Sequence, residues 1–223
     1  MIDRPVGAGV GALPRRGFLR YGAAVGAALA ATAAGLSAGH VCAAPRWRVI
    51  DAALRAGDLL FRRTVSLEGV AVSALDAAGR FSHVGLVAGH DAQGLARVVH
   101  ACPPEYPGET GVREATAQDF VGAADVRDAA AARLPVDAAQ ARAVAQWALR
   151  HVGWDFNDRF ALQSPHALYC TELVWAALRA QHLPQPALAR WNTPLGVLDV
   201  VTLSALLALP GLRFLPQAVQ REA

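Results

Sequence analysis

One cysteine in this sequence has the surroundings of a reactive thiol. Residues 167–180 read ALYCTELVWAALRA, in which Cys170 is followed by an apolar run that predicts a buried helix. At a helix N-terminus, unpaired N–H groups and the macrodipole favour the thiolate. Because a thiolate that attacks a carbonyl group also needs a proton acceptor and donor nearby, we looked for a histidine that the fold could bring within hydrogen-bond reach.

Two histidines lie where neighbouring strands could present them to Cys170. His83 falls in FSHVGLVAG (81–89) and His100 in GLARVVHAC (94–102), and both stretches predict strands. If His83 lies directly opposite His100, residues 90–93 form a four-residue hairpin loop and both imidazoles share one face. A one-residue slip would place them on opposite faces. The hairpin is therefore compatible with a Cys–His–His set but does not require it.

The rest of residues 44–223 predicts segregated strands and helices. Gly- and Pro-rich breaks separate the segments, and Asp137 is the expected N-cap of the longest helix. This order favours an α+β domain with a mainly antiparallel sheet packed against the helix that carries Cys170. The remaining predicted segments are a short helix at 47–56, a strand beginning at 58–63, a short strand and turn within 112–121, a helix at 137–151, a strand or helix at 197–209 and a last short strand at 212–216.

Residues 1–43 have the composition of an export signal. A basic stretch, PRRGFLR (14–20), precedes an uncharged Ala- and Gly-rich segment and a small-residue exit at Val41-Cys42-Ala43. Arg15 and Arg16 with the following Gly-Phe-Leu are similar to a twin-arginine signal. We therefore expect cleavage after Ala43, no stable membrane anchor afterwards, and a periplasmic or otherwise exported protein that has used the twin-arginine export machinery.

The charge balance excludes a nucleic-acid interpretation. All 21 basic residues are arginines, and the formal net charge is +3. Four arginines and one aspartate fall within residues 1–43, so 17 basic and 17 acidic residues remain after cleavage. Because the excess positive charge belongs to the predicted signal, we expect no nucleic-acid partner.

Four blocks of sequence in a fixed order resemble a known enzyme family. GDLLFRR (57–63), SHVGLV (82–87), VVHACP (98–103) and LYCTELVWAAL (168–178) are similar to the permuted papain-like amidases of the YaeF/YiiX group, in the NlpC-type superfamily of cell-wall peptidases. This group places histidine before cysteine, as here. HVGWDF (151–156) and NTP (192–194) also resemble stretches that flank the family's site, and the resemblance covers roughly residues 55–200.

The resemblance implies a role for each candidate residue. Cys170 would be the nucleophile, His83 the general base and acid, and His100 the third polar residue that orients the imidazole of His83. In relatives a glutamate often holds the place of His100, and a neutral histidine would stabilise an imidazolium less. Tyr169 and Trp154 are the candidates for contact with substrate. The resemblance implies no metal or organic cofactor.

The substrate and three other interpretations stay open at this level. An amide of the cell envelope is expected, either a peptidoglycan fragment or an acylated amino acid. The alternatives are a non-catalytic envelope binding module on the same scaffold, an acyltransferase that passes an acyl thioester to an acceptor, and a redox protein that uses Cys102 and Cys170. The absence of a CxxC motif weakens the redox interpretation.

Cys102 raises two further questions. It lies two residues after His100, so strand parity places it on the same face and predicts that it lies near Cys170, where the two could form a disulfide that inactivates the enzyme. A zinc site from Cys102, Cys170, His83 and His100 is conceivable by residue type, but the spacing lacks zinc-finger regularity.

Overall fold

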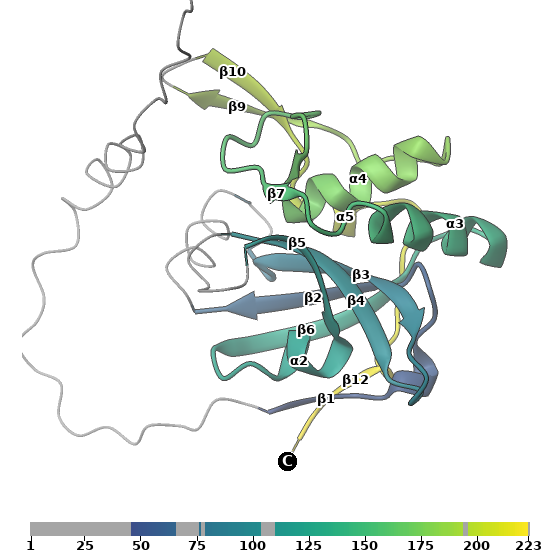
Figure 1. Ribbon diagram of the computed structural model, residues 1–223. Coiled ribbons are helices and arrows are strands. Elements are labelled where there is room, and N and C mark those ends of the chain that lie inside the picture. Colours follow the sequence, from purple (N-terminus) through teal and green to yellow (C-terminus); the bar gives the residue numbers. More distant parts are fainter. Residues whose placement is uncertain (1–45, 66–75, 77–78, 104–109, 194–195, 223) are drawn as a thin grey trace, which may run out of the picture. The chain divides into compact units, whose positions relative to one another are not determined.

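The computed structural model describes residues 46–65, 76, 79–103, 110–193 and 196–222 (Figure 1). The predicted export signal at 1–43 lies outside the described residues. Within the part of the chain that is described, no helix is both long and apolar enough to span a membrane.

The described elements are runs of strands separated by single helices. They are β1 Trp47–Val49, the 3-10 helix η2 Asp51–Ala53, β2 Leu59–Thr64, β3 His83–His90, β4 Ala96–Cys102, β5 Gly111–Thr116, α2 Ala117–Gly122, β6 Val126–Arg133, α3 Ala138–Leu149, β7 Asp155–Phe156, β8 Ala167–Leu168, α4 Cys170–Ala180, β9 Ala189–Thr193, β10 Gly196–Val200, α5 Leu203–Leu207, β11 Arg213–Phe214 and β12 Val219–Arg221.

A six-stranded antiparallel sheet organises the fold. Its strand order is β11-β6-β2-β3-β4-β5, and every neighbouring pair runs antiparallel. Figure 1 shows α3 and α4 on one face of this sheet, and α2 with the β1–β12 pair on the other. The structure therefore confirms the predicted α+β class and the antiparallel sheet packed against the Cys170 helix.

Apolar side chains cover both faces of the sheet. On one face, residues such as Leu86 and Val99 pack against Val144 of α3 and Leu173 of α4. On the other face, a second cluster is built around Phe120 of α2. Because the strands are buried on both sides, a polar group that points from the sheet in either direction must find a partner inside the protein.

The hairpin of β3 and β4 has a different register from the predicted one. Leu86 pairs with Val99 and Val87 with Val98, but Gly89 pairs with Arg97, so an irregularity falls between Val87 and Gly89. Continued along the strands, this register places His100 beside Gly85 instead of opposite His83. The shift is two residues, an even number, so both histidines still lie on one face as predicted.

Gly85 makes room for this arrangement. A Cβ atom on Gly85 would lie 3.2 Å from the Phe120 ring and 3.4 Å from the Cβ of His100. It would also lie 2.6 Å from a methyl group of Val98. A side chain at this position would therefore displace the groups that pack against the two histidines.

One sequence-based assignment is wrong, one is incomplete, and strands β6, β7, β8, β9 and β12 were not predicted. Residues 47–56 form β1 and the single turn η2 instead of a helix, because Trp47–Val49 pairs with Val219–Arg221 near the other end of the chain. The stretch 197–209 is a strand followed by a helix. Strand β6 was missed because its centre, Ala129–Ala132, is four alanines, which favour a helix in isolation. Pairing with β2 and β11 overrides that preference.

The helix capped by Asp137 forms as predicted. The Asp137 carboxylate accepts hydrogen bonds from the backbone N–H groups of Ala139 and Gln140, each at 2.8 Å. The Gln140 side chain accepts the Asp137 N–H in return at 3.0 Å. This reciprocal capping box fixes the start of α3 and hence its position against the sheet.

Gly111 is expected to be the least replaceable glycine next to the site strands. Its φ is +83°, and a Cβ there would collide with the backbone carbonyl of Trp154, which accepts a hydrogen bond from Val112 N–H at 2.7 Å. Gly94 has nearly the same φ, +80°, with nothing within 4 Å. Gly94→Ala should cost about 1–2 kcal/mol of unfolding free energy from backbone strain alone. Gly111→Ala should cost a further 1–3 kcal/mol or so from the collision. Urea unfolding of both variants measures the difference, and equal costs would contradict the prediction.

Candidate active site

Cys170 is the first residue of α4, as the sequence predicted. Its side chain is half-buried, and Tyr169 is the N-cap. The backbone N–H groups of Val84, Thr171 and Cys170 itself act on the sulfur and lower the pKa of the thiol. Because Val84 follows His83 directly, the thiol lies beside the first residues of β3.

The residues on either side of Cys170 hold it against the C-terminal segment. The Thr171 hydroxyl donates to the backbone carbonyl of Val201 at 2.6 Å. The N–H of Val201 donates to the hydroxyl of Tyr169 at 2.9 Å. The N–H and carbonyl groups of Val201 are thus both hydrogen-bonded, to Tyr169 and Thr171 respectively, and these bonds fix the start of α4.

The two candidate histidines form a direct hydrogen bond. His83 Nε2 lies 3.0 Å from His100 Nδ1, and both side chains are buried. This contact leaves Nδ1 of His83 as the ring nitrogen not engaged by His100. A His–His contact of this kind selects the tautomer and orientation of the first imidazole.

The pairing between β3 and β4 ends before it reaches the two histidines. The β3–β4 pairs run from His90 and Ala96 to Leu86 and Val99, although both strands continue, to His83 and Cys102 respectively. Val84 pairs with Phe61 of β2 but has no partner in β4, and its backbone N–H acts on the Cys170 sulfur. The N-terminus of α4 therefore lies next to the start of β3.

Phe120 of α2 holds the imidazoles from the opposite side. Its ring stacks on His83, with centroids 5.5 Å apart, and meets His100 edge-on at 5.1 Å. The guanidinium of Arg62 lies over the same ring, 4.6 Å from its centroid, and donates to the Phe120 carbonyl at 2.9 Å. One aromatic ring thus fixes both histidines and a buried cation.

Arg62 is a site residue that the sequence analysis missed. It pairs across the sheet with His83, is only 8 % exposed, and its Nε has no hydrogen-bond partner among the described residues. A signal for it was present in the sequence. Arg62 and Arg63 are consecutive in a predicted strand, and successive strand residues point to opposite faces, so one of the two arginines had to point inward.

Burial and nearby cations keep both histidines neutral. Burial lowers the pKa of His83 well below its usual value, and the charge of Arg62 and then His100 add to this. Burial lowers the pKa of His100 to about 3, assisted by Arg62 and Arg113. Both imidazoles are therefore unprotonated bases at neutral pH, so the pair can accept a proton but does not hold one in advance.

Burial favours the protonated form of the Cys170 thiol, which is opposite to the effect of the helix terminus. Burial raises the pKa of Cys170 to about 11, although three backbone N–H groups and Arg62 act in the opposite direction. The helix terminus favours the thiolate, but the loss of water around the sulfur has the larger effect on the thiol pKa. If Cys170 attacks a carbonyl group, its thiol must therefore lose its proton in the same step.

Alkylation should report this protonation state directly. Because a raised thiol pKa favours the neutral form, iodoacetamide should react slowly with Cys170 at pH 7, and the rate should rise about tenfold per pH unit up to pH 10. Arg62→Gln removes a charge that lowers the pKa, so its curve should move to higher pH. A rate that is already maximal at pH 7 would contradict the prediction, and Cys170→Ala identifies the labelled residue.

Cys102 lies against His100 and forms no disulfide. Its sulfur is 3.4 Å from His100 Nδ1, and neither Cys102 nor Cys170 is disulfide-bonded. Among the described residues, His83, His100 and Cys102 form a group whose ligand atoms all lie within 4.8 Å of one another, so these three could hold a metal ion. Cys170 is not part of that group. The structure thus brings together three of the four residues considered as zinc ligands.

The two residues predicted to contact substrate occupy different environments. Tyr169 is 2 % exposed, and burial raises the pKa of its hydroxyl. Trp154 is half-buried and meets the rings of His151 and His166 at 4.3 and 5.0 Å. Their role towards substrate stays a prediction.

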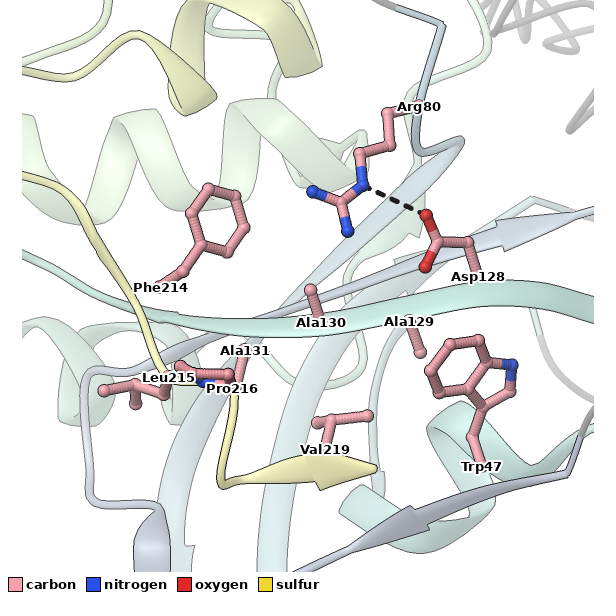
Figure 2. Close-up of a pocket in the computed structure, with 10 residues that line it drawn as sticks. All are labelled: Trp47, Arg80, Asp128, Ala129, Ala130, Ala131, Phe214, Leu215, Pro216 and Val219. Atoms are coloured by element: carbon pink, nitrogen blue, oxygen red, sulfur yellow. Dashed lines mark hydrogen bonds and ion pairs between the residues drawn. The ribbon is translucent and has the colours of Figure 1, made fainter. Parts of the chain in front are cut away.

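A separate pocket of about 270 Å³ lies over β6 (Figure 2). Figure 2 shows Ala129, Ala130 and Ala131 of β6 between Phe214 and Trp47, with an ion pair between Arg80 and Asp128 at one side. None of the candidate catalytic residues lines this pocket.

Comparison with known proteins agrees with this arrangement. The family model described as "Permuted papain-like amidase enzyme, YaeF/YiiX, C92 family" matches residues 53–190. The crystal structure of metalloprotein yiiX from Escherichia coli O157:H7 is similar in fold, with a TM-score of 0.59 and 19% sequence identity over 73% of this chain and 96% of that chain. No curated protein matches the sequence. The matched segment contains Cys170 and both histidines and spans more than half of the protein, so the chain belongs to the family of permuted papain-like amidases.

Proposed function

We propose that this protein is an exported cysteine amidase in which Cys170 is the nucleophile, His83 the general base and acid, and His100 the residue that orients His83. The observation that carries the proposal is the 3.0 Å contact between His83 Nε2 and His100 Nδ1, with the Cys170 thiol held by the N–H of the residue after His83. Histidine-activated cysteine is the usual arrangement for nucleophilic attack on an amide.

The first chemical step uses the neutral forms of all three groups. The sulfur of Cys170 bonds to the carbonyl carbon of the amide while its proton passes to Nδ1 of His83, and the carbonyl electrons move to oxygen. Backbone N–H groups at the start of α4 support the resulting oxyanion. The imidazolium then protonates the leaving amine as the C–N bond breaks, and an acyl-enzyme remains.

Water completes the cycle by the reverse sequence of proton transfers. His83 removes a proton from water, the hydroxide adds to the thioester carbon, and the thiol leaves with the proton that His83 returns. His100 acts through the hydrogen bond to His83 Nε2, which keeps Nδ1 available as the base. Arg62 opposes a positive charge on His83, so the imidazolium exists only transiently.

The substrate is proposed to be an amide of the cell envelope. Peptidoglycan peptides and N-acyl amino acids are the two classes, because the amidase family supplies the bond type and the predicted export signal supplies the location. Arg15 and Arg16 are proposed to direct export. Changing both to lysine should retain the protein in the cytoplasm, and cell fractionation checks this.

The direct test is hydrolysis followed by mass spectrometry. The full chain is incubated with purified peptidoglycan fragments and, separately, with N-acyl amino acids. Release of an amine from one class, with an acyl adduct on Cys170 in the intact protein, would support the proposal. Amine release accompanied by transfer of the acyl group to an added acceptor would instead identify an acyltransferase.

One observation favours a second candidate, an envelope binding module without efficient chemistry. The third polar residue is a neutral histidine, and burial raises the pKa of the Cys170 thiol to about 11. A protein that binds peptidoglycan fragments, forms no acyl adduct and releases no amine would meet this description.

A further inference from the structure

The buried end of the β3–β4 hairpin holds three metal-binding groups at close range. They are His83 Nε2, His100 Nδ1 and Cys102 Sγ, and all of these atoms lie within 4.8 Å of one another. The side chains are 8 %, 3 % and 0 % exposed, respectively. The proposed hydrolysis uses the two histidines but leaves Cys102 without a function.

The separations between these atoms are close to those of a metal site. His83 Nε2 and His100 Nδ1 are 3.0 Å apart, and Cys102 Sγ is 3.4 Å from His100 Nδ1. In a tetrahedral zinc site, bonds of about 2.0–2.1 Å to nitrogen and about 2.3 Å to sulfur place ligand atoms roughly 3.3–3.6 Å apart. The two measured separations are within a few tenths of an ångström of these values, and the third, between His83 and Cys102, is no more than 4.8 Å.

The ligand types select the kind of ion. Two imidazole nitrogens and one thiolate suit zinc and similar transition metals, and not calcium or magnesium, which prefer oxygen. The guanidinium groups of Arg62 and Arg113 act on His100 and oppose a cation here. The negative charge of the Cys102 thiolate would offset that repulsion, so Cys102 is the ligand on which affinity should depend most.

We propose that His83, His100 and Cys102 form a binding site for a zinc-like transition metal ion, and that metal binding and amide hydrolysis exclude each other. A metal needs a lone pair from both His83 Nε2 and His100 Nδ1, whereas in the present hydrogen bond one of these two nitrogens carries the proton. The proton of that bond then moves to the opposite ring nitrogen, and the Cys102 proton goes to solvent. With Nδ1 of His83 protonated, it cannot accept the proton of Cys170.

This inhibitory consequence rests on the proposed function, whereas the metal site itself does not. The two parts therefore need separate readouts. Binding is measured by metal content and by the thiolate-to-metal charge-transfer absorption of a cobalt-loaded protein. Hydrolysis is measured with whichever amide substrate the assays above identify.

The experiment uses the full chain after treatment with a chelator, titrated with zinc or cobalt. One ion per chain is expected, with a cobalt–thiolate band and an increase in the unfolding temperature. Cys102→Ser should weaken binding by at least about tenfold and abolish the band. Cys170→Ala is the matched control and should bind metal like the wild type. Cys102→Ala serves as a second ligand variant if the serine protein does not fold.

The outcomes separate the two parts. No bound metal, or unchanged binding in both Cys102 variants, would overturn the site. Zinc should inhibit hydrolysis in the wild type, and Cys102→Ser should resist at the same zinc concentration. Hydrolysis that requires zinc would overturn the inhibitory role. Metal bound through Cys102 in a chain that hydrolyses nothing would support the site and refute the proposed amidase mechanism.

Discussion

Replacing Cys170 with alanine is expected to reduce kcat/KM for amide hydrolysis by at least about a thousandfold. In the proposed mechanism the thiol forms the covalent bond to substrate, and no other group at the start of α4 can replace it. The fold should persist, because the side chain is only half-buried and the contacts of Tyr169 and Thr171 with Val201 remain. Steady-state kinetics with circular dichroism separates lost chemistry from lost structure.

A double variant makes this test sharper. If Cys170 and His83 act as one unit, His83→Ala alone should cost nearly as much as Cys170→Ala, and the double variant should be no worse than Cys170→Ala. His90 lies at the exposed far end of the same strand, where it contacts the carbonyl of Asp51. His90→Ala is the matched control and should retain activity. Multiplicative losses in the double variant would show that the two residues act independently.

Replacing Glu172 with alanine is expected to be the most destabilising single change near the site, by on the order of 3 kcal/mol or more. The carboxylate is fully buried and accepts hydrogen bonds from Asn157 Nδ2 at 2.9 Å, Gln163 N at 2.7 Å and Tyr169 N at 3.4 Å. Its removal takes this acceptor from the N–H groups of Gln163 and Tyr169, and leaves Asn157 Nδ2 with only the Ala161 carbonyl. Chemical denaturation measures the loss.

The backbone conformation of residues 160–166, which Glu172 holds in place, should increase the loss of unfolding free energy in this variant. Phe160, Gln163 and His166 all have positive φ angles, between 54° and 63°, which non-glycine residues adopt with strain. Glu114 provides the control, because its ion pair with Arg97 at 2.8 Å is partly exposed. Glu114→Ala should cost about 1 kcal/mol or less. If Glu172→Ala costs no more than Glu114→Ala, the carboxylate does not hold this segment.

The parts of the site that could be predicted are those set by local sequence. Cys170 at the start of a helix and His83 at the start of a strand follow from patterns within about ten residues. The shared face of His83 and His100 was predicted even though the register was not. Strand parity survives a two-residue shift, whereas exact pairing depends on the irregularity between Val87 and Gly89. Gly89, with φ +137°, is the residue type that permits such a bulge, but the type alone does not fix which pairing results.

The parts that could not be predicted depend on distant contacts. The β1–β12 pair joins segments from the two ends of the domain, and β6 forms from alanines only because strands lie on both sides. The inward orientation of Arg62 needs the positions of His83 and Phe120. The direction of the Cys170 pKa is likewise set by burial, which is a property of the whole packed domain.

The hydrogen bonds that join Tyr169 and Thr171 to Val201 have a consequence for protein synthesis. The ribosome completes both histidine strands long before it reaches the nucleophile, and the segment that fixes the nucleophile comes about thirty residues later still. A nascent chain that ends before Val201 therefore carries every reactive group but lacks the backbone that places the thiol. If Cys170 is the nucleophile, as proposed, hydrolytic competence is acquired late in translation, once the segment around Val201 has packed against the start of α4.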